Sequence, residues 1–466
     1  MYRRLKIGLA AALVLAAPAI GQQNQTEGSE AERVEGSASG QLVAPGQLVG
    51  PADRILQSLS DTELRLLVSE TLARNPGVAA MRAKARAALS RAPQVGGLPD
   101  PVIGATAWVK SPETRTGPQI LTLNLLQPLP WLSKFDLKEQ ASLFEASALS
   151  SDVEATRLTL VTTVRRLFYE LAFLVRYREV THDFVDHLVQ HEEIARARYA
   201  AGVGASQNVI KIQAEITVAE NLLLDIDQRR IDLESQINEL RDRPVSMVIL
   251  PAALPSLAEM DLDFGVLLDA ASRDRPEVAA MDARIAATEV GVRLAEKEYR
   301  PNFSVGVTYT FVDRRKDTAG LVTPPEGNGD DIFGIRGGIS IPVWRKKLKT
   351  GVEEASDLGL SAQEEKRDVI AGIEAGIGNL MQRIPLTWQQ LRLLEDILIV
   401  QAEESVQSAQ SSYVAGTFNA LDLLDAEHVL FKADTSIARA KADYAIRLVQ
   451  LEGEVGGPLM QYPTTE

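Results

Sequence analysis

The side chains whose types and spacing could support chemistry form two groups, and the first combines an acid with imidazoles. Asp183, His187 and His191 follow one another at intervals of four residues, so they share one face of a helix. Histidines at this spacing can bind Zn²⁺. The same face carries other charges, and a solvated surface is the alternative interpretation. We therefore expect no bound metal and keep these three residues as weak candidate ligands.

The second group is a pair of carboxylates. Asp422 and Asp425 come six and nine residues after Gly416 and lie one helical turn apart. Carboxylates held close together repel one another, raise some of their own pKa values and attract cations. A solvated helix face explains the same pattern when the pair is considered alone.

Composition argues against several classes of function. The 466 residues include no cysteine, so disulfides, thiolate metal sites and cysteine nucleophiles are excluded. We find no glycine-rich phosphate loop, zinc-protease motif or serine–histidine–aspartate arrangement, and we expect a protein that is not an enzyme and needs no cofactor. A net charge of −14 disfavours nucleic acid as a partner, since nucleic-acid-binding proteins carry basic surfaces.

The N-terminal region has the pattern of an exported protein. Residues 1–21 combine a basic start, a short apolar run and small residues before a cleavage point, which predicts a signal peptide. An N-terminal membrane anchor is the alternative, but the apolar run is too short to span a bilayer. Residues 22–60 are rich in Gln, Gly, Ser and Glu, and we expect an extended, disordered leader. No later run has the ~18 apolar residues of a transmembrane helix, so only strands could cross a membrane.

Three short segments recur in the same order in the two halves of the chain. The segment "NPGVAAMRA" at 75–83 returns as "RPEVAAMDA" 200 residues later. "QPLPW" at 127–131 is matched by "SIPVW", and "YAAGV" at 199–203 by "YVAGT" at 413–417. The nearly constant offset indicates a duplicated unit. We expect a first repeat at 61–243, a linker at 244–262, a second repeat at 263–457 and a tail at 458–466.

Helical periodicity dominates both repeats. Each repeat is expected to contain a leading helix, a very long helix and a returning helix after the Tyr-x-Ala-Gly turn. The expected ranges are 61–91, 133–198 and 206–242 in the first repeat, and 276–299, 346–412 and 419–454 in the second. Glycine suits the turns because helix ends often need a positive φ. Pro385 is expected to kink or break the second long helix.

Two short alternating segments precede each long helix. They lie at 103–109, 119–127, 302–311 and 332–341. Apolar residues at every second position are typical of transmembrane strands, and also of an ordinary half-buried hairpin. In a membrane the open edges of four strands would have to be paired, so closure would require several chains. A trimer would supply twelve strands and a helical tube on the same axis.

This order of elements resembles the TolC-like outer membrane efflux proteins over about residues 61–457. The most specific segment is "YVAGTFNALDLLDAEHVLFKADTSIARAKADYAIRLVQLEGEVG" at 413–456. "GGLPDP" at 96–101, together with "QPLPW", is similar to the heavy-metal efflux branch, which is CzcC/CusC-like.

The resemblance implies a fold and a function. It implies a mainly α chain with a small membrane β part, forming a trimeric 12-stranded β-barrel continued by an α-helical barrel. It further implies a passive channel in the outer membrane of a Gram-negative bacterium, with the helices in the periplasm. Its partners would be outer membrane lipid, a periplasmic adaptor and an inner-membrane pump of the resistance-nodulation-division (RND) type. A soluble periplasmic coiled-coil adaptor or spacer is the alternative.

The resemblance also assigns roles to residues. Asp422, Asp425 and Tyr413 match positions of the periplasmic gate, and Phe418 stands where the family often has a locking arginine, so apolar contact by Phe418 is a possible substitute. The residues expected to dock the adaptor at the tips are Tyr199, Ala201, Gly202, Val203, Ala415, Gly416 and Thr417.

Overall fold

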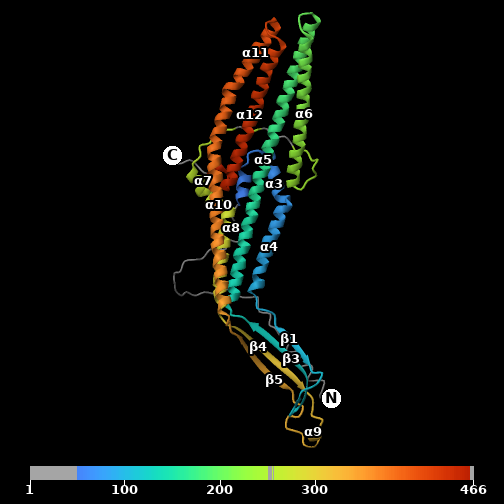
Figure 1. The fold of residues 1–466 in the computed structure, drawn as a ribbon, viewed down its shortest axis with the longest axis vertical. Helices are drawn as coiled ribbons and strands as arrows, with labels where there is room; N and C mark the ends of the chain where they lie inside the picture. The colour runs from blue at the N-terminus through green and yellow to red at the C-terminus, as the bar shows by residue number, and fades with distance from the viewer. Residues whose placement is uncertain (1–49, 250–253, 256, 462–466) are drawn as a thin grey trace, which may run out of the picture. The chain divides into compact units, whose positions relative to one another are not determined.

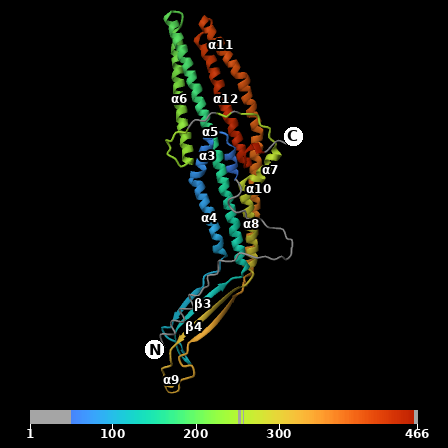
Figure 2. The same cartoon turned by 180° about the vertical axis from the view of Figure 1, so that it is seen from behind.

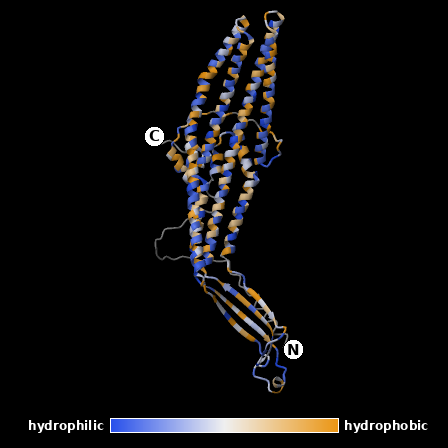
Figure 3. Cartoon of the chain, viewed as in Figure 1, coloured by the Kyte–Doolittle hydropathy of each residue, from blue (hydrophilic) through white to orange (hydrophobic). Residues whose placement is uncertain are grey.

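The computed structural model describes residues 50–249, 254–255 and 257–461 (Figure 1). The expected signal peptide, most of the expected leader and the end of the C-terminal tail lie outside this range. Among the described residues, no helix combines the length and the apolar character needed to cross a bilayer. Figure 3 agrees, because each long helix mixes hydrophobic and hydrophilic residues along its length.

The end of the expected leader is a helix, so the prediction of an extended segment to residue 60 is wrong there. Helix α2 spans Pro51–Ser58 and has proline in its first turn. Proline suits this position because its fixed φ is helical and the missing N–H has no partner in the first turn. Ala52 and Ile55 are fully buried against the core of the first repeat, which gives this short helix its tertiary support.

The leading segment of each repeat consists of two helices, where a single helix was expected. The first repeat has α3, Thr62–Arg74, and α4, Pro76–Gly96. The second has α7, Phe264–Asp274, and α8, Pro276–Lys297. Both breaks come directly before a proline, because proline disfavours the α conformation in the preceding residue. At the first break, the side chain of Asn75 also caps α4 by accepting from the Val78 N–H.

Each repeat continues as a long helical hairpin, as the sequence predicted. In the first, α5 spans Ser133–Ala200 and returns as α6, Ser206–Leu240. In the second, α10, Arg345–Leu393, continues through the short π-helix η2, Leu394–Leu398, into α11, Ile399–Ala415. The chain then returns as α12, Ala420–Val455. Figures 1 and 2 show the two hairpins side by side from opposite directions.

Pro385 does not end the helix, which corrects the expectation of a break. Helix α10 continues through it to Leu393. A proline removes one donor from the helix ladder, but Ile384 and Thr387 on either side are buried, so tertiary packing keeps the segment helical. The irregular turn η2 begins nine residues later, at Leu394.

The strands of both repeats form one antiparallel sheet. Its order is β1, Val102–Ala107; β3, Gly117–Leu129; β4, Asn302–Val312; and β5, Ile332–Ser340. Leu123 of β3 is opposite Tyr309 of β4, which joins the two repeats. Two short elements were not expected: β2, Glu113–Thr114, pairs with β3, and α9, Thr318–Val322, lies between β4 and β5. Strands β1 and β5 are the two edges of the sheet.

Buried side chains form three cores. One belongs to the first repeat and contains Val164 and Phe168 of α5 with residues of α2 and α3. A second belongs to the second repeat and packs α7 against α10 and α12, with Tyr444 fully buried. The third lies nearer the turns and is shared by the two hairpins, because it combines Leu188 of α5 with Leu424 of α12.

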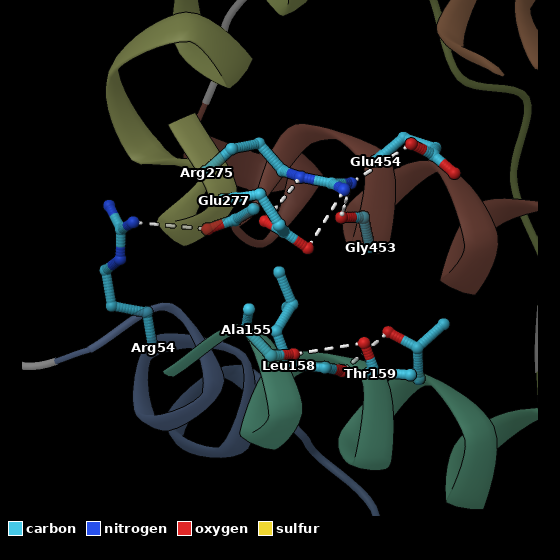
Figure 4. A network of polar contacts seen from close by, with 10 residues as sticks. Arg54, Ala155, Leu158, Thr159, Arg275, Glu277, Gly453 and Glu454 are labelled. Carbon is cyan, nitrogen blue, oxygen red and sulfur yellow. Dashed lines mark hydrogen bonds and ion pairs between the residues drawn. The ribbon is translucent and has the colours of Figure 1, made fainter. Parts of the chain in front are cut away.

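A polar network fixes the point where α8 begins (Figure 4). Arg275 donates to the Gly453 carbonyl oxygen at 2.8 Å and to the Glu454 carboxylate at 3.0 Å, both at the end of α12. It also bonds Glu277 in its own first turn at 3.0 Å. Arg54 of α2 pairs with Asp274 at 3.2 Å. These contacts connect α2, which precedes the first repeat, with the beginning and the end of the second repeat.

Candidate functional site at the helix turns

The two hairpin turns have the same backbone geometry. The Gly202 N–H donates to the Tyr199 carbonyl at 3.0 Å, and the Val203 N–H donates to the Arg198 carbonyl at 3.1 Å. The second turn repeats this pattern, with donors at positions 416 and 417 and acceptors at 413 and 412. This is the Schellman arrangement, and it needs a left-handed residue after the helix. Gly202 and Gly416 supply it, with φ of 74° and 82°.

The expected docking residues at the turns are exposed. This holds for Ala201, Gly202 and Val203 in the first turn and for Ala415, Gly416 and Thr417 in the second. Val203 is 68% exposed although it is apolar. Exposed small and apolar residues at a helix end allow another helical tip to approach closely. The surface therefore fits docking, which stays a prediction.

The two tyrosines before these turns differ in their surroundings. Tyr199 is 53% exposed, whereas Tyr413 is only 2% exposed. Tyr413 belongs to the core that the two hairpins share. Burial raises the pKa of the Tyr413 phenol above its ordinary value. The duplicated turns are thus equal in backbone and unequal in contacts.

Arg198 of α5 holds Tyr413 from the other hairpin. Its Nη1 donates to the Tyr413 carbonyl oxygen, and its guanidinium lies 4.9 Å from the centre of the Tyr413 ring. The contact thus combines a charge-assisted hydrogen bond with a cation–π interaction. Arg198 was not predicted from the sequence. The available signal was an arginine directly before Tyr199, in a chain that lacks the arginine expected near the second glycine.

Phe418 was a possible substitute for that arginine. It is 44% exposed, and its backbone N–H donates to the Ser412 carbonyl at 3.3 Å. The guanidinium that contacts Tyr413 in the described part of the chain belongs to Arg198 of the first hairpin. The side chain of Phe418 remains available at the surface, so its contribution to the gate stays a prediction.

The two candidate gate aspartates have different local roles. Asp422 forms a capping box at the start of α12: its carboxylate accepts from the Asn419 N–H at 3.0 Å, and the Asn419 side chain accepts from the Asp422 N–H at 3.2 Å. Asp425 is exposed, and among the described residues it has no hydrogen-bond or ion-pair partner. Both carboxylates are exposed in the single chain. This exposure fits a ring of carboxylates around an opening, and it fits a solvated helix surface equally well.

The histidines of α5 bind a carboxylate of α12. His191 Nε2 lies 2.8 Å from one oxygen of Glu427, and His187 Nδ1 lies 3.2 Å from the other. Glu427 is only 3% exposed and His191 only 4%. Burial by itself raises the pKa of Glu427, but the hydrogen bonds from the two histidines hold it below its ordinary value.

The candidate metal site is therefore corrected. Asp183 is exposed and does not join His187 and His191, whose common partner is Glu427. Over the described ranges, no group of three or more His, Cys, Asp or Glu side chains is arranged to hold a metal ion. Sequence periodicity placed Asp183 correctly on the helix, but it could not reveal a carboxylate more than two hundred positions away.

Further contacts extend this interface between the hairpins. His428 Nε2 of α12 lies 3.3 Å from a Glu215 oxygen on α6. Phe184 of α5 stacks against Phe431 of α12, with ring centroids 4.6 Å apart. The arrangement contains no nucleophile with an adjacent base. What it can do is hold the two helical hairpins together near their turns.

Comparison with known proteins identifies the family. The sequence profile of the outer membrane efflux protein family matches residues 67–240 and 267–457, which is most of the chain. The chain belongs to this family. The two matched segments correspond to the two repeats of the chain.

Individual relatives of this outer membrane efflux protein are distant. It is 24% identical to toxin and drug export protein A of Aggregatibacter actinomycetemcomitans, over 56% of this chain and 58% of that protein. It is 22% identical to nodulation protein T of Rhizobium leguminosarum bv. trifolii over 76% of both chains. It is 19% identical to the outer membrane protein TolC of Vibrio cholerae, over 71% and 74%. The chain thus spans less than two thirds of the length of the first relative.

Solved structures share the fold at low sequence identity. The outer-membrane channel OprN superposes with a TM-score of 0.73 at 18% identity, covering 94% of this chain and 99% of that one. VceC of Vibrio cholerae gives 0.71 at 19% identity, covering 88% and 100%. CusC gives 0.71 at 14% identity, covering 89% and 99%. These matches show the shared fold, and CusC superposes no better than the other two channels.

Proposed function

We propose that this outer membrane efflux protein is the outer membrane channel of a tripartite efflux system. It is a passive exit duct of a Gram-negative bacterium, with its sheet in the outer membrane and its helices in the periplasm. A periplasmic adaptor and an inner-membrane pump of the RND type are its partners, and the pump supplies the energy. The observation that carries the proposal is the family match over both copies of the hairpin, joined by one shared sheet.

The sheet supports a trimer. Strands β1 and β5 have a neighbour on one side only, and strand edges without partners are not tolerated in a bilayer. Three chains would close a barrel of twelve strands by pairing β5 of one chain with β1 of the next. The six hairpins would then form a helical barrel on the same axis. In this proposal the repeats correspond to residues 61–243 and 263–457.

The turns supply the periplasmic gate and the docking surface. Opening must separate the second hairpin from the first, and the contact of Arg198 with Tyr413 opposes that movement. An adaptor that binds at the exposed tips would favour the open state only if it binds the open state more tightly than the closed state. Asp422 and Asp425 would line the opening after the second turn, and the first turn would serve mainly in docking.

Membrane fractionation followed by planar-bilayer recording tests the proposal. We expect the full chain in the outer membrane fraction, as a trimer that forms conducting channels. A soluble periplasmic adaptor or spacer, which the family match does not favour, would appear in the soluble fraction and form none. Recovery of the folded protein in that fraction would overturn the proposal. Sensitivity of a deletion strain to metals and to drugs would then indicate the class of exported substrate.

A further inference from the structure

Basic side chains gather where the sheet meets the second long helix. Helix α10 begins directly after β5 with Arg345, Lys346 and Lys347, all exposed. Among the described residues, none of these three has an acidic partner within ion-pair distance. The next cation, Lys349, is paired with Glu353 at 3.3 Å. Since the chain as a whole carries a net charge of −14, this local excess of positive charge is unusual for the molecule.

Exposed apolar residues border this basic cluster. Ile341, Val343 and Trp344 are 64%, 63% and 76% exposed. A hollow of about 550 Å³ is lined by Val343 and Trp344 together with the three cations and Thr350. An exposed tryptophan between an apolar strand and lysines is typical of the boundary between bilayer and water. The N-terminus of α10 adds its own partial positive charge.

A second tryptophan and a further cation lie beside strands β3 and β4, at the same end of the sheet as the basic cluster. Trp131 follows β3, and the Arg300 guanidinium lies 5.7 Å from its ring. Register places Leu129 opposite Phe303, and Asn302 opposite Ser340, so these residues share one end of the sheet with the basic cluster. Figure 1 shows the strands joining the long helices at this end.

We propose that residues 343–347 bind the anionic headgroups of phospholipids in the leaflet that faces the periplasm. Lysine and arginine bind the phosphate, while Trp344 and Val343 contact the adjoining acyl region. The inference rests on the proposed outer membrane placement, which puts the helical end of the sheet on the periplasmic side. The cluster would fix the depth of the channel in the bilayer and the angle at which α10 leaves it.

Native mass spectrometry of the purified trimer tests this surface. The detergent-solubilised protein is titrated with phosphatidylglycerol, phosphatidylcholine or inorganic phosphate. Because each lysine near an anionic surface strengthens binding about fivefold, Lys346→Gln with Lys347→Gln should weaken phosphatidylglycerol binding about twenty-five-fold. Phosphatidylcholine binding should stay unchanged. The control Arg82→Gln with Lys84→Gln removes two exposed cations from α4 and should leave both lipids unaffected. Lys346→Arg with Lys347→Arg should retain wild-type binding.

Three outcomes would overturn the inference. Equal phosphatidylglycerol binding by the wild type and the glutamine variant would show that the cluster does not bind lipid. Displacement of the lipid by millimolar phosphate would indicate a site for free phosphate. Loss of the trimer in the variant, without lipid preference in the wild type, would assign the cluster to the contact between chains. Channel recording on the same samples distinguishes failure of this inference from failure of the proposed function. A wild-type protein that forms no channel would contradict the proposed channel function, whatever its lipid binding.

Discussion

At the scale of single residues, Arg198 contacts Tyr413 across the two hairpins, and in the proposed gate it would replace the locking arginine that the chain lacks. The cation reaches Tyr413 from the first hairpin, where the family pattern places an arginine after the glycine of the second. It bonds a backbone carbonyl and lies over the ring of the same residue. A single side chain thereby fixes both the position and the orientation of Tyr413.

The first prediction concerns variants that lack the contact between Arg198 and Tyr413. Arg198→Ala should increase single-channel conductance and the fraction of time spent open, because both interactions with Tyr413 are lost. Arg198→Lys should be intermediate, since lysine keeps the charge but lacks the planar fork of arginine. Planar-bilayer recording of purified trimers measures both effects.

Arg196 provides the matched control. It lies two residues earlier, is 64% exposed and pairs with Glu192 on its own helix. Arg196→Ala removes the same charge from the same helical turn without touching the second hairpin, so its conductance should match the wild type. Equal conductance of the Arg198 and Arg196 variants would show that Arg198 does not hold the gate.

At the scale of elements, α5 and α12 are joined near the turns by a buried carboxylate between two imidazoles. Glu427 accepts from His187 and His191, and its pKa lies below the ordinary value of 4.5. A depressed folded pKa means that the carboxylate stabilises the fold fully above pH 4.5, and that this contribution is lost as pH falls through the folded pKa.

The second prediction uses this pH dependence. Glu427→Gln should lower the free energy of unfolding at pH 7 by about 2 kcal/mol, because hydrogen bonds to an ionised group are lost. The difference from the wild type should persist at pH 5.5 and shrink below pH 4.5. Thermal unfolding followed by circular dichroism between pH 3 and 7 measures it. Glu220→Gln on the exposed face of α6 is the control and should track the wild type throughout. A constant difference down to pH 3 would contradict the role of ionised Glu427.

Elements were predictable where local patterns decide them. The long helices were predictable from apolar periodicity. Their observed ends differ from the expected ends by at most three residues. The strands follow from alternation, as in 302–311. The break before Pro76 could also have been predicted, because proline restricts the residue before it. In the second repeat the expected helix begins correctly at residue 276, and the preceding helix α7 was not predicted. Pro385 shows the opposite case, because buried neighbours override a local signal.

The site was predictable only in part, for a physical reason. The turns and the two aspartates are local features, and the sequence located them by spacing and resemblance. Arg198, by contrast, meets Tyr413 across 215 positions, and His191 meets Glu427 across 236. No periodicity within one helix specifies which side chain of another hairpin it will meet. Packing of the two repeats creates these contacts.

At the scale of the whole molecule, the two copies of the repeat differ in the residues that follow their common turn. The turns share one backbone geometry, but the second copy carries Asp422 and Asp425 where the first has Asn208 and Lys211. In a trimer the second copy would place six carboxylates around one axis. The first copy would surround them with exposed apolar tips. The proposed gate and the proposed docking surface would therefore be neighbours built from the same motif.

The last prediction tests the carboxylate ring. Because Asp422 also caps α12, Asp422→Asn with Asp425→Asn is the suitable variant: asparagine keeps a side-chain acceptor for the Asn419 N–H and removes the charge. The cation-over-anion permeability ratio should fall severalfold, and block by divalent cations should weaken, because the focused negative potential is lost. Asp225→Asn with Asp232→Asn removes two exposed charges from α6 and should change neither property. Unchanged selectivity in the first variant would establish the solvated-face interpretation. If Asp425→Asn alone reproduced the full effect, Asp422 would be a capping residue and the ring would consist of three carboxylates.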